Sequence, residues 1–68
     1  MKGNKTMNKT YYFTSPEGED FFVEAENNRA ARECARDMFG EGCKYHGVVS
    51  EEWAEMQGFD TYSADTYC

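Results

Sequence analysis

Two segments near the start of the chain alternate between apolar and polar positions with the period of a β-strand. Lys9–Thr14 alternates around Tyr11 and Phe13, and Asp20–Ala25 alternates in the same way. Between them, the sequence Ser15-Pro16-Glu17-Gly18 places proline where a type I turn needs a φ of about −65°, and glycine where such turns end. This pattern predicts a β-hairpin.

The apolar period then changes from two residues to about 3.6, which is typical of an amphipathic helix. Asn27 or Asn28 can cap the N-terminus of this helix, which we expect over residues 29–39, and Gly40 can end it. Arginines alternate with acidic residues on the other side of the predicted helix, which is typical of a solvated face. Its apolar face consists of Ala31, Cys34, Ala35 and Met38.

Residues 43–49 read as a third strand, with Tyr45 and Val49 on one side and Val48 on the other. Gly47 would permit a β-bulge in this strand. Ser50 can then cap a short helix that ends at Gly58. From Phe59 onward the chain is acidic and aromatic, and we expect a short strand or an ordered arm.

Together these elements predict an α+β domain, with a small antiparallel sheet in β-β-α-β-α order and the amphipathic helix packed on one face. We expect residues 1–8 to form a flexible N-terminal segment, residues 9–63 the single domain, and residues 64–68 a loose tail. A chain of 68 residues has a small core, because it buries only about 60% of its unfolded surface. The predicted core is Tyr11, Phe13, Phe21, Val23, Ala31, Cys34, Ala35, Met38, Tyr45 and Val49.

The opposite face of the predicted sheet carries an apolar strip that the long helix cannot cover. This strip consists of Tyr12, Phe22 and Val48. It either receives apolar residues from the C-terminal segment or pairs two subunits in a homodimer. We favour the first alternative, in which the cover comes from Trp53, Met56 and Phe59.

The formal net charge of −6 is distributed unevenly along the chain. Residues 10–68 contain all 13 carboxylates and only four of the seven basic residues, which gives this part a charge of −9. Such a body repels nucleic acid and anionic membranes and favours basic partners. The simpler alternative is that the charge only keeps a small protein in solution.

The C-terminal segment combines acidic and aromatic residues in a way that favours binding to a basic protein surface. Carboxylates on a rigid surface can occupy positions that phosphates would take, and aromatic side chains anchor protein interfaces. A solvated acidic helix beside core aromatics is the alternative interpretation. The candidate partner-binding residues are Glu51, Glu52, Trp53, Glu55, Phe59, Asp60 and Tyr62.

Catalytic and metal sites have weaker support in the sequence. The single histidine has no recognisable catalytic motif around it, so we predict no enzymatic activity and no cofactor. A zinc site would have to use Cys34, Cys43, His46 and Cys68, whose spacing is poor for one tetrahedral ion, so we predict no metal. Three cysteines argue against a closed disulfide framework, and no apolar run approaches the roughly 20 residues that span a bilayer. We therefore expect a cytoplasmic protein.

One part of the chain resembles a known group of proteins. Residues 23–27, the small-residue helix with Ala31 and Ala35, and residues 43–49 are similar to the strand-helix-strand centre of small phage-encoded inhibitors of the anti-CRISPR type. The resemblance implies a protein from a phage or mobile element that docks on a host defence complex in the cytoplasm of a bacterial host. This chain departs from the inhibitors in charge, because its body is acidic, so no residue role is carried over. An acidic member would compete for a basic channel as a DNA mimic; the alternatives are a homo-oligomeric module and a small zinc module.

Overall fold

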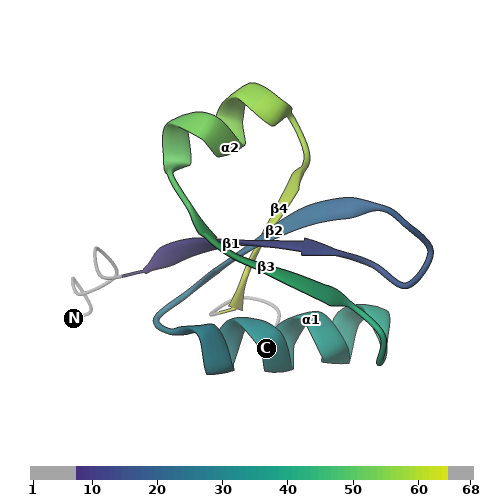
Figure 1. The fold of residues 1–68 in the computed structure, drawn as a ribbon. Helices are drawn as coiled ribbons and strands as arrows, with labels where there is room; N and C mark the ends of the chain where they lie inside the picture. The colour runs from purple at the N-terminus through teal and green to yellow at the C-terminus, as the bar shows by residue number, and fades with distance from the viewer. Residues whose placement is uncertain (1–7, 65–68) are drawn as a thin grey trace.

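The computed structural model describes residues 8–64, which form a four-stranded sheet with one helix on each side (Figure 1). The elements are β1 (Lys9–Thr14), β2 (Asp20–Ala25), α1 (Asn28–Phe39), β3 (Lys44–Val49), α2 (Glu51–Gln57) and β4 (Asp60–Ser63). The α+β class is confirmed, and a fourth strand follows the predicted order. The predicted terminal segments lie outside the described residues, except for Asn8 and Ala64.

The sheet is mixed, so the prediction of a purely antiparallel sheet was wrong. Its strand order is β3-β1-β2-β4, and β1 pairs with β2 and with β3 in antiparallel orientation. Strand β4 instead pairs with β2 in parallel. The connection through α2 explains this, because it carries the chain from one edge of the sheet to the other, as parallel pairing requires. It also places α2 over the face opposite α1 (Figure 1).

The predicted hairpin is confirmed, and Ser15 holds its turn together. The N–H of Gly18 donates to the carbonyl of Ser15 at 2.9 Å, and the N–H of Ser15 donates to the carbonyl of Glu19 at 2.7 Å. The Ser15 hydroxyl oxygen also accepts bonds from the N–H groups of Glu17 and Glu19. Gly18 has a φ of +96°, which glycine adopts readily. These bonds explain why a buried serine is tolerated there.

Both ends of α1 follow the predicted capping chemistry. Of the two candidate caps, Asn27 is the one used: its side-chain oxygen accepts from the N–H of Ala30 at 2.8 Å. At the other end, the N–H of Gly40 donates to the carbonyl of Arg36 at 2.7 Å, with a φ of +90° at the glycine. The helix therefore starts one residue earlier than predicted and ends where expected.

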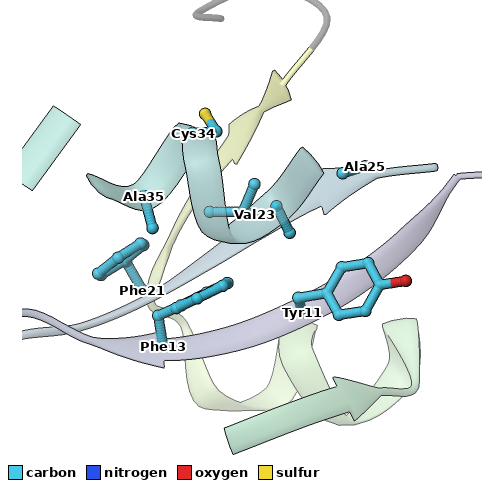
Figure 2. Close-up of a cluster of buried hydrophobic side chains, with 8 residues drawn as sticks. Tyr11, Phe13, Phe21, Val23, Ala25, Cys34 and Ala35 are labelled. Carbon is cyan, nitrogen blue, oxygen red and sulfur yellow. The ribbon is translucent and has the colours of Figure 1, made fainter. Parts of the chain in front are cut away.

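The main core lies between α1 and the sheet (Figure 2). Small residues on α1 let the helix approach the strands closely, and the rings of Phe13 and Phe21 stack with centroids 5.6 Å apart. Met38 and Val49 are only partly buried, and Tyr45 is 40% exposed, so the prediction that these three residues are buried in the core was wrong. The predicted core residues that are buried are Tyr11, Phe13, Phe21, Val23, Ala31, Cys34 and Ala35.

A β-bulge at His46 changes which residues of β3 face α1. Tyr12 pairs with Gly47 and Phe13 pairs with Tyr45, so His46 is the extra residue. Beyond the bulge, Val48 pairs with Tyr11 on the α1 side, and Val49 pairs with Thr10 on the opposite side. The predicted sides of the two valines were therefore wrong. Strict alternation fails here because one added residue reverses every later side chain.

Gly47 makes this bulge possible, so we expect its replacement by alanine to destabilise the fold. Its φ is +113°, and a Cβ at this position would meet no atom within 4 Å. The cost of Gly47→Ala would therefore come from the backbone conformation, about 1–3 kcal/mol of unfolding free energy. Urea denaturation would measure it, with Lys44→Ala on the same strand as a control. Wild-type stability of the Gly47 variant would contradict the need for a positive φ.

The two described cysteines differ in state. Cys34, which is fully buried on α1, is disulfide-bonded, whereas Cys43 is a free thiol. Disulfides are typical of oxidising compartments. Because one cysteine is disulfide-bonded, the cysteines no longer support the expectation of a cytoplasmic protein. Neither helix within residues 8–64 is long and apolar enough to cross a membrane.

Candidate functional site: the α2 face

Helix α2 is short, and local interactions define both of its ends. The Ser50 hydroxyl oxygen accepts from the N–H of Trp53 at 3.2 Å. Glu51 and Glu52 occupy the first turn, where the helix dipole stabilises negative charge. Gly58 ends the helix in the left-handed conformation, with a φ of +73°. The predicted cap and stop are both confirmed.

Helix α2 and the loop after it cover the second face of the sheet. The ring of Phe22 lies 6.0 Å from Trp53 and 5.4 Å from Phe59, measured between centroids, and Phe22 is fully buried. Tyr12 contacts the same two rings at 5.6 and 6.0 Å, and Ala54 on α2 is also buried. We call the four aromatic residues, Tyr12, Phe22, Trp53 and Phe59, the α2-side aromatic cluster. It confirms the predicted intramolecular cover.

Two details of that predicted cover were wrong. Met56 is 81% exposed and does not contribute to the cluster, and Val48 lies on the α1 side of the sheet because of the bulge. Phe22 has no exposed surface with which to contact a second subunit. The strip predicted for a homodimer is therefore not a continuous surface in this structure.

The structure brings most of the candidate binding residues together and separates two. Glu51, Glu52 and Glu55 are exposed on α2, and Asp60 is exposed at the start of β4. Trp53 is 38% exposed, and Phe59 is half-buried in the α2-side aromatic cluster.

Asp60 pairs with Phe21, which belongs to the core beside α1, so Asp60 lies on the other face of the sheet from these glutamates. Tyr62 lies on that same face. It pairs with Val23 in the register of β4, and its ring packs against Phe21 and Phe39 at 6.0 and 5.8 Å. Tyr62 is therefore part of the α1-side packing and does not belong to the α2 face. The spacing of acidic and aromatic residues could not reveal this, because a strand sends successive side chains to opposite faces.

A further acidic residue joins the site from a distant part of the chain. Glu24 on β2 lines a depression of about 390 Å³ together with Glu51, Glu55 and Phe59. The alternation of side chains along β2 could have revealed Glu24 from the sequence, because Glu24 lies on the same face of the strand as Phe22. We define the α2 face as Glu24, Glu51, Glu52, Trp53, Glu55, Met56 and Phe59.

The sheet separates this acidic face from the arginines of the protein. Arg29, Arg32 and Arg36 all lie on α1, on the other side of the sheet (Figure 1). Within residues 8–64, the ion pair that forms is Arg29 with Glu33 on the same helix, at 3.5 Å. Such an exposed pair contributes little to stability. The carboxylates of α2 consequently have no cationic partner among the described residues.

No protein-family model, curated protein or solved structure matches this chain. Any functional assignment therefore depends on the geometry and charge of the α2 face. The resemblance to phage-encoded inhibitors remains a hypothesis.

The candidate zinc ligands do not converge on one point. Cys34 is buried and disulfide-bonded, so its sulfur is not available to a metal ion. Cys43 packs at the end of α1, where its thiol donates to the carbonyl of Gly40 at 3.5 Å, while His46 lies on the α2 side. Within residues 8–64, no three histidine, cysteine or acidic side chains are grouped to hold an ion. Cys68 lies outside the described residues.

His46 takes part in a network that ties β3 to the hairpin. Its ring stacks on Tyr12 with centroids 4.4 Å apart, and its Nε2 lies 2.8 Å from the hydroxyl of Thr14. That hydroxyl donates to Asp20 at 2.8 Å, so its oxygen is free to accept from the histidine. Burial is the main cause that raises the pKa of the Tyr12 hydroxyl, and the nearby Asp20 carboxylate raises it further. In a catalytic triad the histidine stands between acid and hydroxyl, whereas here the hydroxyl stands between acid and histidine.

Proposed function

We propose that this chain is a non-enzymatic binding protein whose α2 face docks on a basic surface of a partner that handles nucleic acid. Binding there excludes nucleic acid from the same surface. The observation that carries the proposal is the separation of charge: the acidic residues of the α2 face have no basic neighbour on α2 and no ion-pair partner within residues 8–64. Complementary charge of this kind steers association and selects the partner.

Two apolar side chains on α2 support a protein partner over a small cation. Met56 is 81% exposed and Trp53 is 38% exposed, and they are three residues apart, hence neighbours on the helix surface. Tryptophan is enriched among residues that dominate interface energies, and methionine adapts to irregular surfaces. Glu52 and Glu55 lie beside them. The face thus combines apolar anchors with charge.

The narrower form of the proposal is an inhibitor of a host defence complex of the CRISPR-Cas type. It rests on the resemblance over residues 23–49 and on the role that the acidic face would have as a mimic of the nucleic-acid backbone. As such an inhibitor, the protein acts in stoichiometric amounts and catalyses no reaction.

A capture experiment with the full chain tests the function. The protein is immobilised and exposed to bacterial lysate with and without nuclease. We expect a basic nucleic-acid-binding protein to be retained after digestion, and an added oligonucleotide to displace it, because both ligands need the same surface. A retained partner that binds its oligonucleotide and this protein simultaneously would refute competition.

A further inference from the structure

A second hollow lies on the other side of the sheet, next to α1. Its volume is about 370 Å³, and it is bordered by α1, by residues 40–43, by Phe13 on β1 and by Tyr45 on β3. The rings of Phe13 and Tyr45 line it, with centroids 5.3 Å apart. Phe13 is almost fully buried, whereas Tyr45 is 40% exposed. The hollow therefore offers the accessible ring of Tyr45 next to the buried ring of Phe13.

Guanidinium groups of α1 surround this aromatic surface. The Cζ atom of Arg32 lies 5.7 Å from the centre of the Tyr45 ring, and Arg36 lines the same hollow one helical turn further on. Arg29 also lines it but is already paired with Glu33. Within residues 8–64, Arg32 and Arg36 have no ion-pair partner, although acidic residues outnumber basic ones in this chain.

The residues that line the hollow carry a net positive charge, which favours an anionic ligand. Its lining contains three arginines and two acids, Glu33 and Glu41, and hence a net positive charge of one. The thiol of Cys43 adds no negative charge, because burial raises its pKa and its S–H points to backbone carbonyls. A thiol in this state is also a poor nucleophile. The hollow is suited to binding and not to covalent chemistry.

We propose that this hollow binds a small aromatic phosphate, such as a mononucleotide, with its ring against Tyr45 and its phosphate between Arg32 and Arg36. Guanidinium groups recognise phosphate through paired hydrogen bonds and stack on aromatic rings. The volume lies in the range of about 300–1,000 Å³ that small-molecule sites occupy. The site is independent of the α2 face, because the sheet lies between them (Figure 1). Either proposal can therefore fail without the other.

Titration of the isotope-labelled full chain by NMR tests this site, with AMP, phenyl phosphate and inorganic phosphate as probes. We expect saturable shifts of the Gly40, Gly42 and Cys43 amides with the two aromatic phosphates. Inorganic phosphate should bind several-fold more weakly, because it makes no ring contact. Equal affinity for inorganic and phenyl phosphate would refute recognition of the ring.

Two arginine variants and one control locate the binding. Arg32→Gln and Arg36→Gln should each weaken phenyl phosphate binding by about tenfold, the usual cost of one charge-assisted hydrogen bond. Lys44→Gln, which removes a neighbouring charge from outside the hollow, should bind like the wild type. The proposal is overturned if neither aromatic probe gives saturable shifts at about 10 mM. Unchanged affinity in both arginine variants would overturn it equally.

Discussion

Replacement of Phe22 by alanine is expected to remove most of the stability of this domain. The Phe22 side chain is fully buried and contacts the rings of Tyr12, Trp53 and Phe59. Truncation of a buried phenylalanine costs about 3–5 kcal/mol of unfolding free energy. A domain of this length has about 3–10 kcal/mol in total. We therefore expect Phe22→Ala to be partly or wholly unfolded at room temperature.

Urea denaturation, followed by the fluorescence of Trp53, would measure the loss for Phe22→Ala. Val48→Ala is the control: Val48 is 57% exposed, so its truncation should change the free energy by no more than about 0.5 kcal/mol. Near wild-type stability of the Phe22 variant would mean that α2 does not pack on the sheet as described.

Reversal of the three glutamates of α2 is expected to abolish binding to a basic partner. Glu51→Lys, Glu52→Lys and Glu55→Lys together replace an acidic helix surface with a basic one. Juxtaposed like charges cost several kcal/mol, so affinity should fall by at least about a hundredfold. Folding should survive, because all three side chains are exposed and none forms an ion pair within residues 8–64. The circular dichroism spectrum would check this.

The matched control reverses three acids on the other side of the sheet. Glu26→Lys, Asp37→Lys and Glu41→Lys change the net charge by the same amount, and all three residues are exposed on or beside α1. Isothermal titration calorimetry of both triple variants against the captured partner would compare them. A partner that docks on the α2 face should bind the control normally at physiological salt, where charges beyond about 8 Å are screened. Equal loss in both variants would indicate that only net charge matters.

Local structure was predictable wherever it depends on residues close in sequence. The hairpin turn follows from Pro16 and Gly18, and the helix ends follow from the cap residues Asn27 and Ser50 and from Gly58. Each of these interactions spans at most four residues. The prediction therefore needed no knowledge of how the elements pack.

The errors arose where a partner strand decides the outcome. The possible bulge at Gly47 was anticipated, but its effect on Val48 and Val49 was not, because the pairing with β1 determines where the extra residue goes. The parallel pairing of β4 likewise depends on the path through α2. Asp60 and Tyr62 were assigned to the binding surface for the same reason: their side of the sheet follows from their register with β2.

The sequence alone determined the element types, the caps and the excess of carboxylates, because alternation, capping chemistry and charge are properties of neighbouring residues. Only the tertiary structure decided that α2 covers Phe22, that Glu24 joins the acids of α2, and that the arginines of α1 lie on the opposite side of the sheet. These outcomes depend on contacts between residues far apart in the chain. Such contacts form only when the crossover connections place one helix on each face.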